Sequence, residues 1–406
     1  MKDRVQGWCP SLLRPMQSAD GWILRLKPPY CQLSGEAARV IAEASRTYGE
    51  GKLELTRRAS LQLRGMAKSG LEPVARQAIE LGLASDDAAV EARRNILVSP
   101  LLGADPGLAE ASRCLVRRLE IGLAETQLFA GLPDKFGFLV DGGGLWPLTE
   151  ASDLSLRPGA RRLDLGGRFA LHLSAQQDAA SAALAISEAF AARDERKQGR
   201  ISALGAEQIA ALVAQAGLSG RMEEASDVGS TRKPALGFHQ LDEKLGAVLA
   251  LWPFGALSAQ QLEDTAGLAE TFGDGIVRLT PWRCLAIAGV SSEVWPEFAV
   301  KLGSAGALLD PLSAFLRIEA CPGAPACAEA SVKTRCFARQ LAAVLPPDRH
   351  AHVSGCSKGC AHPRETDLTF VGAAGDWFLI RNGTAASPAA LRLSSSEQAL
   401  EEVRRD

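Results

Sequence analysis

Four cysteines in two spaced pairs are the residues of this sequence best suited to carry chemistry. Cys321 and Cys327 stand in "EACPGAPACAEA" with C-x5-C spacing, and Cys356 and Cys360 stand in "SGCSKGCAHP" with C-x3-C spacing. The glycines and prolines around them predict turns, in which backbone N–H groups can point toward sulfur. Thiolates gathered in this way bind zinc or iron–sulfur clusters. We therefore predict a metal centre held by these four cysteines.

The spacing of the cysteine pairs favours a 4Fe–4S cluster over zinc. Structural zinc sites usually have two to four residues between paired ligands, which makes C-x5-C wide for zinc. A cluster held by four thiolates is larger and tolerates this spacing. The alternative is four unligated cysteines in a core. The remaining cysteines lack paired spacing and are expected to be structural: Cys9, Cys31, Cys114, Cys284 and Cys336.

Composition excludes several classes of partner. The chain has 406 residues and a net charge of −2, so no general basic field predicts nucleic-acid binding. No apolar stretch is long enough to span a membrane, and "MKDRVQGWCPSLLRP" lacks the apolar run of a signal peptide. Nine cysteines without a disulfide pattern suit a reducing compartment. We expect a cytoplasmic protein that binds neither membrane nor nucleic acid.

The elements that position these residues include an internal repeat. Segments 33–65 and 257–289 align without a gap. Each copy follows an apolar run, then has a serine N-cap (Ser34 or Ser258), a helix ending at glycine (Gly49 or Gly273), and an alternating strand. This order predicts two ferredoxin-like halves of the split βαβ type, which we expect to pack into one pseudo-symmetric sheet.

The final strands of the two copies, 52–65 and 276–289, are predicted to differ on one face. In the first copy that face carries Arg58, Ser60, Gln62 and Arg64, whereas the second carries Trp282, Cys284, Ala286 and Ala288. Two interpretations of the cationic face remain open. It is either a solvated surface or a site for a large anion, because guanidinium groups match carboxylates.

The fold class that we predict is α+β, with a pseudo-two-fold repeat of ferredoxin-like half-domains and a 4Fe–4S-binding α/β region. The expected units are a first half-domain (1–75), an α/β domain with a junction (76–235), a second half-domain (236–305) and a cluster domain (306–406). The tail after residue 384 is expected to be weakly ordered.

The motifs together resemble the sulfite and nitrite reductase superfamily, whose members bind a 4Fe–4S cluster through C-x5-C and C-x3-C. "TRRASLQLRG" is similar to its tetrapyrrole-binding strand, "RRNILVSPLLGADP" to its R-N loop and "LPDKFGF" to its L-P-R-K-F segment. The resemblance spans roughly residues 20 to 380. It implies that the tetrapyrrole or an anion is bound by Arg58, Gln62, Arg64, Arg94, Asn95 and Lys135.

A finer pattern resembles the precorrin-3B synthase branch of this superfamily, through "GWCPSLLRPMQSADGWILRLKP", "LPDKFGF", "RLTPWR" and "SGCSKGCAHP". It implies O2-dependent hydroxylation of precorrin-3A at ring carbon 20, with γ-lactone formation, in aerobic cobalamin biosynthesis. The implied cofactors are the cluster and a mononuclear non-haem iron, with electrons from a separate donor protein. Trp282 is expected to line the tetrapyrrole site. Asp134 departs from the reductases, which have arginine there, and a carboxylate repels a small oxyanion.

Two alternatives stay open at this stage. A sirohaem-dependent sulfite or nitrite reductase predicts bound sirohaem. A non-catalytic iron–sulfur electron-transfer subunit predicts no tetrapyrrole binding and a solvated arginine face. The iron ligands are not assigned, although a facial triad needs two histidines and a carboxylate. His350, His352 and His362 lie near the second cysteine pair, together with Glu365 and Asp367.

Overall fold

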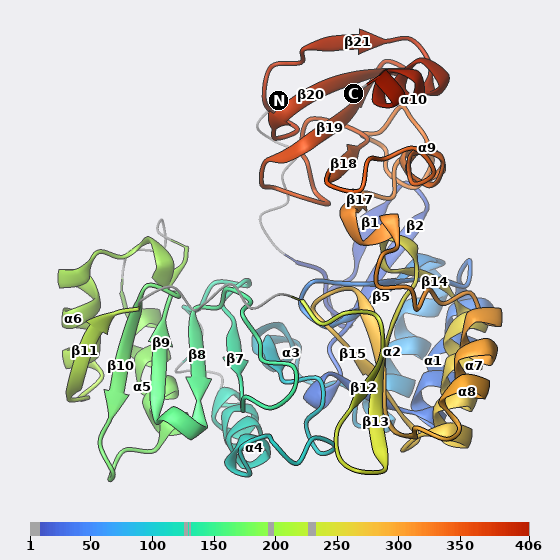
Figure 1. Cartoon of the computed structure of the whole chain (residues 1–406). Helices are drawn as coiled ribbons and strands as arrows, with labels where there is room; N and C mark the ends of the chain where they lie inside the picture. Colours follow the sequence, from blue (N-terminus) through green and yellow to red (C-terminus); the bar gives the residue numbers. More distant parts are fainter. Residues whose placement is uncertain (1–8, 126–128, 130, 194–198, 226–232, 406) are drawn as a thin grey trace.

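The computed structural model describes residues 9–125, 129, 131–193, 199–225 and 233–405, and these form four sheets (Figure 1). Two sheets are built from the repeat, a third lies to one side of them, and a fourth carries the cysteines. No helix within these ranges is both long and apolar enough to cross a membrane. The observed class is α+β, as predicted.

The first repeat sheet has the order β1–β2–β5–β4–β14 and the second has β12–β13–β16–β15–β3. The bounds in the first are β1 (Met16–Ser18), β2 (Gly21–Leu26), β5 (Leu61–Met66), β4 (Lys52–Leu55) and β14 (Ala256–Ser258), with helices α1 (Gly35–Tyr48) and α2 (Leu71–Glu80). In the second they are β12 (Gly237–Gln240), β13 (Leu245–Leu251), β16 (Cys284–Ser291), β15 (Ile276–Leu279) and β3 (Gln32–Ser34), with helices α7 (Ala259–Phe272) and α8 (Trp295–Ser304).

The two halves exchange an edge strand, so the expected single sheet is wrong and two sheets are present. β3 of the first copy pairs with β15 of the second, and β14 of the second pairs with β4 of the first. The chain crosses over at equivalent kinks, where Tyr30 and Phe254 have φ values of 57° and 65°. In the exchanged pair, α1 packs against α7.

The predicted helix ends are confirmed. Ser34 Oγ accepts from the N–H of Ala37, and Ser258 Oγ accepts from the N–H of Gln261, both at 3.1 Å. Gly49 and Gly273 are the C-cap residues of α1 and α7. The serine caps provide hydrogen-bond acceptors for backbone N–H groups that have no partner within the helix.

The predicted strand 52–65 is instead a hairpin, β4–β5, in which Leu53 faces Leu63. Thr56 Oγ1 accepts from the N–H groups of Arg58 and Ser60 at 3.2 Å, and Ala59 has a positive φ of 46°. Side-chain hydrogen bonds of this kind replace the strand ladder with a turn. The segment 276–289 breaks in the same way, at Thr280–Cys284. Arg58 therefore lies in a turn, whereas Arg64 lies on β5.

The third sheet has the order β11–β10–β9–β8–β7–β6 and lies beside the repeat sheets. Its strands are β6 (Ile96–Val98), β7 (Phe138–Val140), β8 (Leu154–Arg157), β9 (Arg162–Leu165), β10 (Phe169–Leu173) and β11 (Gly220–Glu224). Helices α3 (Ala88–Arg93), α4 (Ala111–Leu123), α5 (Ala179–Ala191) and α6 (Ala206–Gln215) belong to this region.

The fourth sheet has the order β17–β18–β19–β20–β21. Its strands are β17 (Ile318–Ala320), β18 (Ala351–Ser354), β19 (Thr366–Ala373), β20 (Asp376–Gly383) and β21 (Leu391–Leu393), with helices α9 (Thr334–Leu341) and α10 (Ser396–Arg405). The expectation of a weakly ordered tail is wrong. Ala399 and Val403 of α10 are buried in the core of this sheet, because their spacing of four gives the helix one apolar face.

Candidate metal centre and substrate cavity

The two cysteine pairs follow two neighbouring parallel strands. Cys321 comes directly after β17, and Cys356 lies two residues after the end of β18. β17 and β18 are parallel, with Ala320 opposite Val353, so their carboxyl ends meet at one edge of the sheet. Cys327 and Cys360 lie in the loops that leave this edge. The structure thus brings together the four residues that the spacing singled out.

The thiols lie close enough to influence one another. Burial raises the pKa of Cys360, and the neighbouring Cys356, Cys321 and Cys327 raise it further. The N–H of Gly355 donates to Cys321 Sγ at 3.2 Å. Soft thiolates with a backbone donor are the donor set that an iron–sulfur cluster uses. Within the described ranges, no group of three or more His, Cys, Asp or Glu side chains is arranged to hold a single metal ion.

The first cysteine loop is held tightly against α9. Gly323 has a positive φ of 69°, and a Cβ there would lie 2.3 Å from Thr334 Oγ1. That hydroxyl donates to the carbonyl of Cys321 at 2.6 Å. Glycine is needed at position 323 on both counts, because a side chain would strain the backbone and displace Thr334.

A cavity of about 940 Å³ lies where the cluster region meets the two halves of the repeat. This volume is at the upper end of the usual range for a ligand pocket, which is about 300–1,000 Å³. Two of its lining residues flank the cysteines in sequence, since Glu319 precedes Cys321 by two and His362 follows Cys360 by two. The cationic residues of the lining outnumber the acidic Glu150, Glu319 and Asp348, and they are Arg57, Lys233, Arg283, Arg317 and Arg364.

Arg283, Arg317 and Arg364 form no ion pair with a carboxylate among the described residues. Burial, together with the nearby Arg57, lowers the pKa of Arg283 to about 10. The Nε atoms of Arg283 and Arg317 are buried and have no hydrogen-bond partner among the described residues. Buried donors without acceptors are costly. The cavity is therefore suited to a ligand that carries several carboxylates.

The lining of the cavity also includes apolar residues, among them Trp282. An adjoining pocket of about 50 Å³ shares Trp282 and Arg283 and is otherwise mostly apolar, with Phe254 and Phe315. The rest of the predicted apolar face has another role. Cys284, Ala286 and Ala288 pack in a buried core with Trp146.

Arg57 joins the cavity to the cluster region. Its guanidinium forms an ion pair with Glu319 and donates to the carbonyl of Ala361 at 3.1 Å. Its Nη2 also lies 3.1 Å from His362 Nδ1. Nearby, His352 is fully buried, and burial lowers its pKa to about 4, with His362 contributing next. Sequence reasoning selected neither Arg57 nor Glu319, because their neighbours are distant in the chain.

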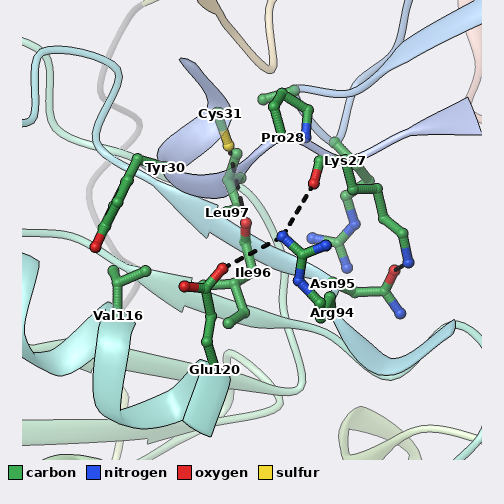
Figure 2. Close-up of a pocket in the computed structure, with 12 residues that line it drawn as sticks. Lys27, Pro28, Tyr30, Cys31, Arg94, Asn95, Ile96, Leu97, Val116 and Glu120 are labelled. Carbon is green, nitrogen blue, oxygen red and sulfur yellow. Dashed lines mark hydrogen bonds and ion pairs between the residues drawn. The ribbon is translucent and has the colours of Figure 1, made fainter. Parts of the chain in front are cut away.

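Three predicted substrate residues meet at a second, much smaller pocket of about 30 Å³ (Figure 2). Arg94 forms two ion pairs there: its Nη1 lies 2.6 Å from Glu91 Oε2, and its Nη2 lies 3.4 Å from Glu120 Oε1. Asn95 Nδ2 donates to the carbonyls of Asp134 and Phe136 at 3.0 Å. Arg58, which also lines it, donates to the carbonyl of Ala151 at 3.1 Å.

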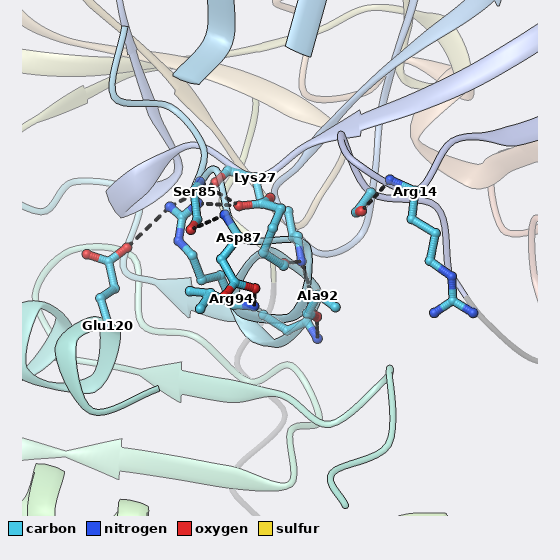
Figure 3. A network of polar contacts seen from close by, with 11 residues as sticks. Arg14, Lys27, Ser85, Asp87, Ala92, Arg94 and Glu120 are labelled. Carbon is cyan, nitrogen blue, oxygen red and sulfur yellow. Dashed lines mark hydrogen bonds and ion pairs between the residues drawn. The ribbon is translucent and has the colours of Figure 1, made fainter. Parts of the chain in front are cut away.

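Lys27 is the centre of a polar network around this pocket (Figure 3). Its Nζ donates to the carbonyls of Glu91 and Ala92 and to Asn95 Oδ1. Burial lowers its pKa to about 8, and this effect exceeds the opposing attraction of Glu91. Arg94 and Lys27 are thus engaged in fixing α3 and the following loop to the first repeat sheet.

We expect the stability contributed by Lys27 to rise with pH between about 8 and 10.5. The folded-state pKa lies below the ordinary value of 10.5, so the unfolded chain binds more protons in this window. The gain is at most roughly 3 kcal/mol. Urea unfolding of wild type and of Lys27→Met across this pH range measures this gain. The difference between their free energies of unfolding reports Lys27 alone, because the titrations of all other groups cancel. A constant difference would contradict the prediction.

The other predicted substrate residues lie apart from that pocket. Gln62 on β5 contacts the guanidinium of Arg25, and Lys135 is exposed. Asp134, at the position that departs from the reductases, pairs with Arg14 at 3.2 Å. The role of all six residues as substrate ligands stays a prediction.

Arg64 is buried in an ion network that supports the first cysteine loop. Its guanidinium lies 3.1 Å from Asp20 and 3.6 Å from Glu54, and it donates to the carbonyl of Ala326, next to Cys327, at 3.3 Å. Burial raises the pKa of Glu54, but Arg335 and Arg64 together bring it below its ordinary value. A substrate carboxylate at Arg64 would compete with two paired acids.

Replacing Arg64 with methionine is expected to cost about 3–5 kcal/mol of unfolding free energy, because it leaves two buried carboxylates short of a partner. Arg39→Met is the matched control. The Arg39–Glu270 pair is about 40 % exposed on each side chain, and exposed pairs of this kind contribute little to stability. Urea unfolding of the anaerobic protein measures both. An equal loss of unfolding free energy in Arg64→Met and Arg39→Met would contradict the prediction that the Arg64 network is the more stabilising of the two.

Comparison with known proteins agrees with this architecture. The family described as "Nitrite/Sulfite reductase ferredoxin-like half domain" matches residues 14–81 and 242–305, which confirms the internal repeat. The structure of the Mycobacterium tuberculosis NirA protein superposes with a TM-score of 0.73 at 18% identity, over 95% of this chain and 80% of that chain. The fold is thus that of the nitrite and sulfite reductases, with the ferredoxin-like half-domain present twice.

Sequence relatives define the family more narrowly. A precorrin-3B synthase from Sinorhizobium sp. is 30% identical over 403 residues, which cover 94% of this chain and 83% of the relative. A ferredoxin–nitrite reductase from Synechococcus elongatus is 25% identical over 90% of this chain and 79% of its own. The chain belongs to this family of oxidoreductases, which includes precorrin-3B synthase.

Proposed function

We propose that the protein is a precorrin-3B synthase, an O2-dependent monooxygenase of aerobic cobalamin biosynthesis. The observation that carries the proposal is the large cavity beside the cysteine loops, whose lining combines an excess of cations with apolar residues and in which the buried Nε atoms of Arg283 and Arg317 have no acceptor among the described residues. Precorrin-3A is a macrocycle rich in carboxylate side chains, so it needs both features. The relationship to the Sinorhizobium enzyme supports the same assignment.

In this proposal the residues of the cavity bind and orient the macrocycle. Arg283, Arg317 and Arg364 receive its acid side chains, and Trp282 lies against its apolar ring. The cysteines would hold a 4Fe–4S cluster, which would pass on electrons from a separate donor protein, and a mononuclear iron would serve the oxygen chemistry. One oxygen atom of O2 is added to the macrocycle at ring carbon 20, and the other is reduced to water by two electrons from the donor and two protons from solvent. We place this reaction in the cytoplasm, since none of the nine cysteines, all of which lie in the described residues, forms a disulfide.

The anaerobically purified protein tests the proposal directly. We expect a broad cluster absorption without sirohaem bands, total iron in excess of acid-labile sulfide, and conversion of precorrin-3A that requires O2 and a reductant. Sirohaem bands with activity on nitrite or sulfite would overturn the proposal in favour of a reductase. Failure of the intact cluster-loaded protein to bind precorrin-3A would also overturn it.

A further inference from the structure

Three acidic residues among the described residues line the cavity, and two of them are paired with arginines. Glu319 forms an ion pair with Arg57. Asp348 is 75% exposed and lies 3.9 Å from Arg349. The third, Glu150, belongs to no ion pair among the described residues. Glu150 is therefore the cavity acid whose proton is not displaced by an adjoining guanidinium.

The carboxyl group of Glu150 lies against Trp282. It accepts a hydrogen bond from the Trp282 side chain and another from the N–H of Thr149, the latter at 3.1 Å. Glu150 is only partly buried, so its carboxyl group is in contact with the cavity. In the proposed function the macrocycle lies against Trp282, which puts the Glu150 carboxyl group next to the ring.

The segment that follows Glu150 is held in place by buried polar contacts. Arg58 Nη1 donates to the carbonyl of Ala151 and to Ser152 Oγ, both at 3.1 Å. Asp153, which is buried, accepts from the N–H of Gly137 at 3.0 Å. A side chain on a segment fixed in this way keeps its position when a ligand binds. Arg58 thus supports the position of Glu150 from outside the cavity.

The surroundings of Glu150 favour its protonated form. Burial raises the pKa of Glu150 above its ordinary value, and this effect exceeds the opposing hydrogen bonds and the attraction of Lys233. The charged groups that face Glu150 are Lys233, which also lines the cavity, and Arg58. A carboxyl group whose pKa is raised toward neutrality can hold a proton and give it to a substrate.

The proposed reaction needs such a proton at the macrocycle. In net terms, the π bond between ring carbons 1 and 20 is replaced by two C–O bonds. One joins carbon 20 to the oxygen atom from O2, and the other joins carbon 1 to an oxygen of the ring-A acetate. The acetate enters as a carboxylate, so the oxygen at carbon 20 must take up one proton to become a hydroxyl group.

We propose that Glu150 is a catalytic residue of this reaction, the general acid that gives its carboxyl proton to the oxygen at carbon 20 as the acetate oxygen bonds to carbon 1. The inference rests on the proposed function and deepens it. Glu150 then regains a proton from solvent, to which its side chain is partly exposed. This assigns a proton donor to the lactone-forming step from a loop that none of the sequence motifs includes.

Glu150→Gln tests the assignment, because it keeps the shape of the side chain and removes the acidic proton. We expect kcat for lactone formation to fall by about 100- to 10,000-fold, the usual contribution of a general acid. The Kd for precorrin-3A, measured by absorbance titration under argon, should stay close to that of wild type. The wild-type kcat should fall as the pH rises through the pKa of Glu150, because only the protonated form donates. Glu150→Gln should lack this fall, and Glu150→Asp should recover part of the rate.

Asp348→Asn is the matched control, since it also removes a carboxylate from the cavity lining but at an exposed, arginine-paired position. It should keep the wild-type kcat, and acid-labile sulfide on every variant verifies that the cluster is intact. A wild-type kcat and pH profile in Glu150→Gln would overturn this inference alone, as would a loss of precorrin-3A affinity that accounts for the whole loss of rate. A wild-type protein that does not convert precorrin-3A would overturn the proposed function, and this inference with it.

Discussion

Replacement of Cys360 by serine is expected to abolish both the iron–sulfur cluster and the activity. Cys360 lies in the loop after β18 with Cys321, Cys327 and Cys356 around it, and a cluster requires all four thiolates. Substitution of an outer-shell residue at a metal site already lowers metal affinity or activity by up to about 100-fold. Loss of a ligand should therefore lower the activity by more than about 100-fold. Acid-labile sulfide and the cluster absorption of the anaerobic protein give the readout.

Cys336→Ser is the control for this experiment. Cys336 is an exposed thiol on α9, in the same region of the chain but outside the two pairs. It should keep a full complement of iron and sulfide. A Cys360→Ser protein with wild-type sulfide content would refute the assignment of Cys360 as a ligand, and loss of the cluster in Cys336→Ser would indicate general instability instead.

Removal of two cavity cations is expected to weaken tetrapyrrole binding severely. In Arg283→Met combined with Arg317→Met, the macrocycle loses two charged partners whose Nε atoms have no other acceptor among the described residues. A hydrogen bond to a charged group contributes about 1.5–3 kcal/mol, so each substitution should raise the Kd by roughly 10–100-fold. Absorbance titration with precorrin-3A under argon measures the change.

The control carries the same change of charge on a distant surface. Arg39→Met with Arg118→Met removes two arginines that form exposed pairs with Glu270 and Asp178. This protein should bind the tetrapyrrole within about 3-fold of wild type, because surface charges are screened. Equal weakening in both double variants would mean that net charge, and not the cavity, governs binding.

Local chemistry made a good part of this protein predictable from its sequence. Helix caps at Ser34 and Ser258, the glycine stops and the cysteine spacing all depend on residues close together in the chain, and the structure confirms the repeat and gathers the four cysteines. The turn within 52–65 was missed, because an alternating pattern continues through "TRRAS" and only the hydrogen bonds of Thr56 show where the strand is interrupted. The order of the C-terminal tail was missed because α10 is short and gains its stability by packing.

Only the tertiary structure decided which charged side chains are free to bind a ligand. Arg64 and Arg94 are basic residues in suitable motifs, yet Asp20, Glu91 and Glu120 neutralise them from other elements. The cavity cations come from separate loops at residues 57, 233, 283, 317 and 364, so no local spacing connects them. The strand exchange and the docking of the cysteine-bearing sheet bring those loops together. The sequence determined which cysteines we propose as cluster ligands, whereas long-range packing determined where the cavity that we propose for the substrate lies.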